Sequence, residues 1–90
     1  MKLKLMIKGG GFVMIMIFID SKIEHLQEVI GQRVNLDFDS MTGELYINAL
    51  QTGKYIKLSS NININNEGRY VIISDNDNDS LFIMKDLNEE

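Results

Sequence analysis

The chain has 90 residues with no proline, cysteine or tryptophan, a single histidine and a formal net charge of −4. This length supports one domain, residues 1–90, with a modest core. The absence of cysteine excludes disulfides, thiolate zinc sites and a cysteine nucleophile. The acidic balance disfavours broad binding to a phosphate backbone, which needs a basic face.

The N-terminal part of the chain carries an apolar run at residues 12–19. A membrane-spanning helix needs about 20 apolar residues, so this run is too short to cross a bilayer, and no small-residue cleavage site follows it. We therefore expect a cytoplasmic protein with no membrane partner. Upstream, Lys-Gly-Gly at 8–10 followed by Met14 is the pattern of a translated ribosome-binding site. This pattern predicts a natural start at Met14 and makes residues 1–13 an upstream extension.

Residues 21–30 are predicted to form a short amphipathic helix. Asp20 and Ser21 stand at its start as helix-start residues, each with an oxygen on a short side chain. The apolar residues that recur with helical spacing are Ile23, Leu26 and Ile30. Gly31 ends the predicted helix. His25 lies off the apolar stripe, and we interpret it as a surface residue.

The rest of the chain alternates apolar and polar residues, which is the period of a half-buried strand. Turn-forming residues interrupt the alternation at spacings of about ten residues. The predicted strands are residues 34–38, 45–49, 55–64, 70–73 and 81–84, with the apolar run at 12–19 as a sixth. Residues 2–8 add an edge strand if the three glycines that follow form a hairpin turn. The predicted fold class is α+β: one short amphipathic helix and a mostly antiparallel five- to six-strand meander or small open barrel.

The acidic charge is uneven along the chain. Residues 1–58 carry a net charge of +1, and residues 59–90 carry a net charge of −5. One interpretation is a solvated end with a frayed acidic tail at 86–90. The other is an acidic surface that meets a basic partner, such as a protein that binds nucleic acid.

Asp75, Asp77 and Asp79 alternate in the manner of a calcium loop, where oxygens at every second position wrap a hard cation. The sixth position of such a loop requires glycine and is Ser80 here, and the twelfth is Asp86 in place of glutamate. Asn and Asp also favour turns on their own. We therefore interpret this segment as an Asx-rich hairpin turn and predict no metal, with calcium binding as the alternative.

No residues combine into a catalytic site in the sequence. A nucleophile needs an adjacent base, and His25 has no serine or aspartate at a spacing that supports a triad. Asp37 and Asp39 share the solvated face of a predicted strand. A chain of this length also leaves little room for an enclosed pocket. We therefore predict that the protein is not an enzyme and needs no cofactor.

Three neighbouring features lie within residues 65–81. They are the loop Asn65-Asn66-Glu67-Gly68, the strand Tyr70-Val71-Ile72 and the turn from Asp75 to Ser80. Together they resemble a stretch of the small Cas9-inhibiting anti-CRISPR proteins of Listeria prophages. In that family an acidic loop sits against the arginines with which Cas9 reads its PAM, so the resemblance implies DNA mimicry. Glu67 and Gly68 match the contacting loop, whereas Arg69 stands where the family is polar or acidic.

The order of the predicted elements is similar to that of the Sm-like barrels, which bind RNA as rings. It runs from a short helix through Gly31-x-x-Val34-x-Leu36 to five strands. The Asp and Asn that hold the base in the first Sm motif have no counterpart between Leu45 and Leu58. The similarity therefore implies a fold and no shared activity.

These observations predict a small acidic binding protein, encoded by a phage or mobile element, that inhibits a host nucleic-acid-binding or defence protein through an acidic surface. The partner is a host protein with a basic surface, direct nucleic-acid binding is not expected, and the protein is a monomer or homodimer. The residues assigned to partner binding are Glu67, Gly68, Asp75, Asp77 and Asp79. The alternative is an Sm-like or SH3-like barrel that binds RNA or a small nucleotide as a homo-oligomer.

Overall fold

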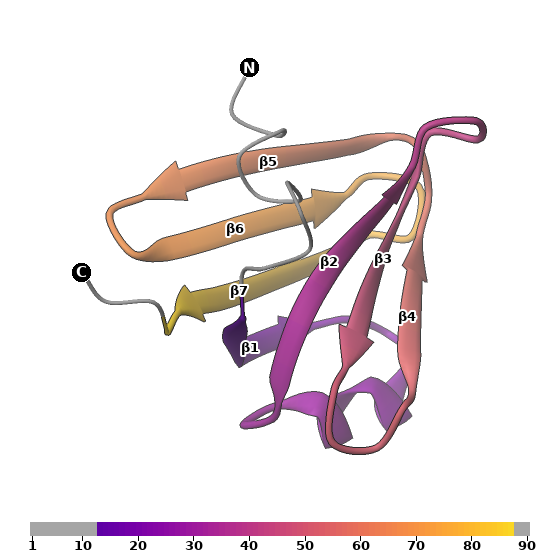
Figure 1. Cartoon of the computed structure of the whole chain (residues 1–90). Helices are drawn as coiled ribbons and strands as arrows, with labels where there is room; N and C mark the ends of the chain where they lie inside the picture. Colours follow the sequence, from indigo (N-terminus) through magenta and orange to yellow (C-terminus); the bar gives the residue numbers. More distant parts are fainter. Residues whose placement is uncertain (1–12, 88–90) are drawn as a thin grey trace.

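The computed structural model describes residues 13–87, and its strands form one antiparallel sheet (Figure 1). The seven strands are β1 (Met14–Asp20), β2 (Arg33–Asp39), β3 (Glu44–Ala49), β4 (Tyr55–Leu58), β5 (Ile62–Glu67), β6 (Tyr70–Asp75) and β7 (Ser80–Asp86). Their order across the sheet is β4-β3-β2-β1-β7-β6-β5, so β4 and β5 are the two edges and the sheet is open.

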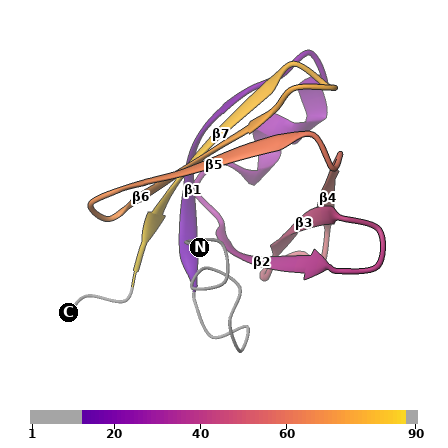
Figure 2. The same ribbon diagram turned by 90° about the horizontal axis from the view of Figure 1, so that it is seen from above.

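The sheet folds over on itself at β1. This strand pairs with β7 along its length but with β2 only at Met14 and Ile15, and its register with β7 shifts between Met16 and Phe18. A bulge of this kind bends a strand and increases its twist. In the view from above, β1, β7, β6 and β5 therefore form one layer and β2, β3 and β4 the other (Figure 2).

The core lies between these two layers. Alternate residues of each strand point inward, as the period of two requires. The largest of the fully buried apolar side chains are Phe82, Met14, Met16, Leu45, Ile47, Leu58, Ile73 and Met84. They come from β1, β3, β4, β6 and β7, so both layers contribute to a single apolar cluster.

The prediction of an amphipathic helix at 21–30 is wrong. The structure has only a 3₁₀ turn, η2 (Glu24–Val29), and contains no α-helix among residues 13–87. Val29 is buried and Leu26 packs against the core, but Ile23 and Ile30 are exposed. The segment is short, and isolated helices of that length are marginal in water. Pairing also limits it, because Gly31 N–H donates to the carbonyl of Met16 at 2.7 Å and returns the chain to β1.

The predicted strand at 55–64 is two strands in the structure. It divides at residues 59–61, the β4–β5 link, and its halves become the two opposite edges of the sheet. Residues 13–87 therefore contain seven strands in place of the expected five or six, and their fold is all-β in place of α+β. The antiparallel arrangement is confirmed.

Several predictions fall at the ends of the chain. The expected upstream extension and the edge strand at 2–8 lie outside the described residues, apart from Val13. Asp86 is the last residue of β7, and its N–H donates to the carbonyl of Arg69 at 2.8 Å; residues 88–90 of the predicted tail lie outside the description. Between residues 13 and 87, no helix has the length and apolar character needed to cross a membrane.

Candidate functional site

The turn between β6 and β7 is built around one buried carboxylate. Asp75 is 1% exposed and ends β6. It accepts hydrogen bonds from N–H and Oγ–H of Ser59, at 3.1 and 2.7 Å, and from the backbone N–H of Asp77 at 3.2 Å. Asn78 donates from its backbone N–H at 3.3 Å and from Nδ2 at 2.7 Å. Asp75 therefore shapes the turn and ties the β4–β5 link to it.

These hydrogen bonds also set the pKa of Asp75. Burial by itself raises the pKa of a carboxyl, because it removes water from the charged form. The donors on Ser59 and Asn78 stabilise the carboxylate and outweigh that effect, so the pKa of Asp75 lies below its ordinary value. The side chain is ionised at neutral pH and faces the protein interior, which makes it a residue that supports the surface.

Asp77 and Asp79 are the exposed acids of this turn. Asp77 accepts a hydrogen bond from Nδ2 of Asn61 in the β4–β5 link at 3.0 Å, and the N–H of Asn76 donates to the carbonyl of Asn61 at 2.9 Å. Asp79 has a positive φ of 53°, which Asp tolerates better than most residues, and lies 4.0 Å from the exposed ammonium of Lys22. The turn therefore presents two solvated carboxylates on a backbone held by the link.

The turn between β2 and β3 reaches the other side of the β4–β5 link. A Cβ placed on Gly43 would lie 3.4 Å from Cβ of Ser60, so this turn is in contact with the link. Asp39 and Glu44 flank it; Asp39 accepts from the N–H of Met41 at 3.0 Å, and Glu44 lies 3.6 Å from Nζ of Lys57.

Asp20, the last residue of β1, also lies beside the β6–β7 turn. Asp20 and residues of that turn line one polar hollow of about 260 Å³. We call this region the acidic end; its acidic residues are Asp20, Asp39, Glu44, Asp75, Asp77 and Asp79. Half of them precede residue 59, in the part of the chain whose net charge is near zero. Sequence reasoning missed Asp20 and Glu44 and assigned Asp39 only to a strand. The alternation of turns along an antiparallel chain was a signal for Asp39 and Glu44, because it groups the β2–β3 turn with the β4–β5 link and the β6–β7 turn. Asp20 joins them only through the pairing of β1 with β7.

Glu67 and Gly68, the other two predicted site residues, lie elsewhere. They belong to the turn between β5 and β6, whereas Asp75 stands at the opposite end of β6 (Figure 1). Glu67 ends β5 and is exposed, opposite Tyr70. The structure therefore brings Asp75, Asp77 and Asp79 together and does not bring Glu67 and Gly68 to them.

The calcium alternative for the β6–β7 turn can be compared with this geometry. Among residues 13–87, no three or more His, Cys, Asp or Glu side chains form a group that could hold a metal ion. Both carboxylate oxygens of Asp75 accept N–H or O–H donors from Ser59 and Asn78. The first position of the predicted loop is thus engaged within the protein.

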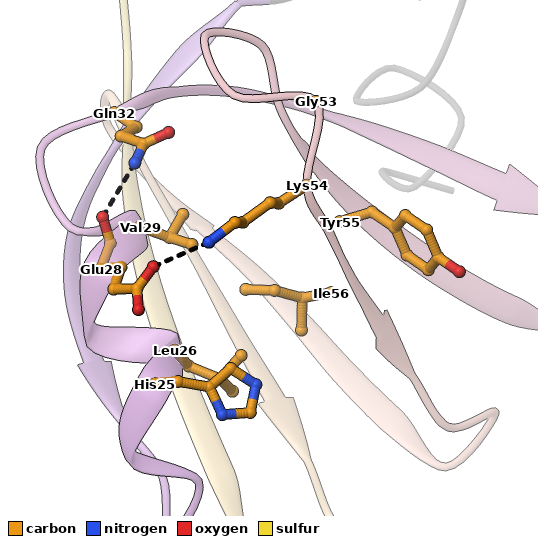
Figure 3. A pocket seen from close by; sticks show the side chains of 9 residues that line it. All are labelled: His25, Leu26, Glu28, Val29, Gln32, Gly53, Lys54, Tyr55 and Ile56. Carbon is orange, nitrogen blue, oxygen red and sulfur yellow. Dashed lines mark hydrogen bonds and ion pairs between the residues drawn. The ribbon is translucent and has the colours of Figure 1, made fainter.

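A second concave feature lies between η2 and the turn that joins β3 to β4 (Figure 3). It is a groove of about 330 Å³ with Leu26, Val29 and Ile56 as its apolar residues. Lys54 Nζ lies 2.9 Å from Oε1 of Glu28 across the groove. The hydrogen bond from Lys54, and then its charge, hold the pKa of Glu28 below its ordinary value.

The ion pair between Lys54 and Glu28 leads to a prediction about the pKa of Glu28. Replacing Lys54 with methionine is expected to return the pKa of the Glu28 carboxyl to its ordinary range, because the largest cause of the lowering is the hydrogen bond from Lys54. Carboxyl chemical shifts followed by NMR during acid titration measure this directly. An ordinary pKa for Glu28 in the unaltered protein would show that the ion pair does not persist in solution.

The fold and the site define a small all-β protein with an open seven-stranded antiparallel sheet and a carboxylate-rich end. Comparison of the chain with protein-family models, with curated proteins and with solved structures finds no match.

Proposed function

We propose that the protein is a small, non-enzymatic inhibitor that binds a basic surface of a host nucleic-acid-binding or defence protein through its acidic end. The observation that carries the proposal is the grouping of carboxylates from three chain segments at the acidic end, with Asp77 and Asp79 exposed to solvent. We further infer that a phage or mobile element encodes it and that it acts in the cytoplasm.

Electrostatics favour a basic partner for this end. Among residues 13–87, the positive side chains that accompany these carboxylates are Lys22 and Lys57. Arg33 and Lys54 lie at the start of β2 and in the β3–β4 turn, at the other ends of those strands. Arginine and lysine of a partner would form charge-assisted hydrogen bonds with the open carboxylates, and opposite potentials speed encounter.

The resemblance to Cas9-inhibiting proteins supports the same mode of action, since a cluster of carboxylates can occupy arginines that otherwise contact DNA. In this chain the exposed acids of the β6–β7 turn and the loop at Glu67 and Gly68 are separated by the length of β6. We therefore assign the main contact to Asp77 and Asp79. Asp75 supports them from inside, and Glu67 and Gly68 are assigned to a separate, secondary contact.

A competition assay tests this function. Guide-loaded Cas9 proteins and bacterial restriction endonucleases are bound to a fluorescent target duplex, and the protein is added while anisotropy is recorded. Displacement of the duplex from at least one of them, saturating at one protein chain per enzyme, is the expected result. Retention of the duplex by every enzyme of the panel would contradict the proposal.

The purified protein also distinguishes the proposed inhibitor from the alternative function. An Sm-like or SH3-like RNA-binding homo-oligomer would purify as a ring with bound nucleic acid, visible in light scattering and in the ratio of absorbance at 260 and 280 nm. The inhibitor is expected to purify free of nucleic acid.

A further inference from the structure

The outer face of the layer formed by β1, β7 and β6 carries apolar side chains in an ordered grid. Strand register places Phe18, Ile83 and Ile72 side by side in a middle row. One flanking row consists of Ile15, Lys85 and Tyr70, and the other of Asp20, Leu81 and Ser74. Across β1, β7 and β6 the middle row is apolar, whereas each flanking row mixes apolar and polar side chains. The edge strand β5 continues the three rows with Asn65, Glu67 and Asn63.

This face is open to solvent in the described part of the chain. Phe18 is 45% exposed, Tyr70 42% and the bulge residue Ile17 40%. Figure 2 shows η2 and the strands β2 to β4 on the opposite side of the layer. A shallow hollow of about 430 Å³ at the border of this face, where the link from η2 to β2 meets β1, is lined by Ile15, Ile17, Ile30, Tyr70 and Lys85 among others. Contiguous apolar surface of this kind marks interaction sites in soluble proteins.

We propose that this face binds a second copy of the chain in a symmetric dimer, with the two sheets packed face to face and the two-fold axis along the middle row. Phe18, Ile83 and Ile72 of the two copies then meet at the centre. Sheets packed in this way lie about 10 Å apart with interdigitated side chains. The inference is independent of the proposed inhibitory function.

The charges on the flanking rows favour a second copy of the chain on this face, with the two-fold axis along the middle row. With the axis along the middle row, the row of Lys85 in one copy covers the row of Asp20 in the other, and each Lys85 comes within one strand of the other copy's Asp20. An axis parallel to the strands would instead place Lys85 against Lys85. Self-complementarity of one patch is what a two-fold interface requires. The chosen axis also directs the β6–β7 turns of the two copies away from each other, so that Asp77 and Asp79 of each copy stay available to a partner while Asp20 joins the dimer interface.

Light scattering during size-exclusion chromatography of the full chain measures the expected association. At about 500 μM the mass should approach twice 10.3 kDa and fall on dilution. Phe18→Asp should weaken dimerisation by at least about tenfold, because it buries a charge at the centre of the interface. Met41→Asp is the matched control, since Met41 is 93% exposed in the β2–β3 turn, away from this face.

The charge pair offers a second readout. Lys85→Glu should weaken the dimer several-fold by placing like charges across the interface, and adding Asp20→Lys should restore it. Circular dichroism confirms that each variant is folded, and Ile17→Asp replaces Phe18→Asp if the latter is not. A monomeric full chain at about 500 μM would overturn the proposal and leave residues 1–12 or another protein as the cover. A dimer that survives the substitutions at both Phe18 and Ile17 would also overturn it.

Discussion

Replacing Asp75 with alanine is expected to lower the free energy of unfolding by about 3 kcal/mol. The side chain is buried and accepts five hydrogen bonds, from Ser59, Asp77 and Asn78. Its removal leaves those donors without their acceptor and releases the β4–β5 link from the β6–β7 turn. Urea denaturation at neutral pH measures the loss.

Asp77→Ala is the matched control for this substitution. Asp77 lies two residues further along the same turn, is exposed and accepts a hydrogen bond from Nδ2 of Asn61. Its loss is expected to change the free energy of unfolding by about 0.5 kcal/mol or less, as is usual for surface positions. Similar losses at the two positions would show that the buried carboxylate does not organise this end of the sheet.

The stability contributed by Asp75 depends on pH in a defined direction. The pKa of Asp75 is lower in the folded protein than its ordinary value because Ser59 and Asn78 stabilise the carboxylate. This contribution is therefore complete above the unfolded pKa of about 3.9 and disappears as the pH falls through the folded pKa. The difference in unfolding free energy between the unaltered protein and Asp75→Asn should narrow below about pH 4. A difference that stays constant down to that range and beyond would contradict the low folded pKa.

The second large effect concerns the exposed acids. Replacing Asp77 and Asp79 together with asparagine is expected to weaken inhibition of the partner by about tenfold or more, because two carboxylates are lost from the contact. Asparagine keeps the turn, since it also tolerates the positive φ of Asp79. The inhibition constant in the duplex competition assay measures the change.

Glu67→Gln provides the control for this double substitution. It removes one exposed carboxylate in the β5–β6 turn, at the far end of β6 from Asp77 and Asp79. Its effect on inhibition should be smaller than about threefold if the acidic end is the main contact. A loss at Glu67 that equals the loss from the double substitution would move the contact to the other end of the hairpin.

Hydropathy alternation was sufficient to predict most of the sheet. The predicted strands at 34–38, 45–49 and 81–84 lie inside β2, β3 and β7, because one face of each strand packs on the core and the other does not. Alternation failed at 55–64, where the pattern continues past the β4–β5 link without glycine or proline to mark a break. A tertiary contact divides that segment, because the N–H and Oγ–H of Ser59 donate hydrogen bonds to Asp75, which lies far along the chain.

The helix prediction failed for a related reason. Helical spacing of Ile23, Leu26 and Ile30 describes a face, but only Leu26 of these three packs against the core. The connection between β1 and β2 is constrained by the pairing of Gly31 with Met16, so the chain has room for a single 3₁₀ turn. The spacing of apolar residues within a segment does not indicate how far apart the fold holds the two ends of that segment.

The candidate site was predictable in part. The Asx-rich composition of residues 75–79 correctly predicted a turn, because Asn and Asp side chains hydrogen-bond to the backbone around them. Composition could not distinguish the buried Asp75 from the exposed Asp77 and Asp79, since all three are aspartates at alternating positions. Nor could regional charge reveal Asp20 and Glu44, which join the same end only after the strands pair.

The most direct test of the acidic end as a partner-binding surface is the salt dependence of inhibition. The inhibition constant is measured in the duplex competition assay between about 50 and 300 mM KCl. Over this range the Debye length, which sets the reach of a charge in solution, falls to well under about 15 Å. Inhibition by the unaltered protein should weaken steeply with salt, and the variant with asparagine at Asp77 and Asp79 should show a shallower slope and weaker inhibition at low salt. Equal slopes for the two proteins, or inhibition that salt does not change, would contradict binding through these carboxylates.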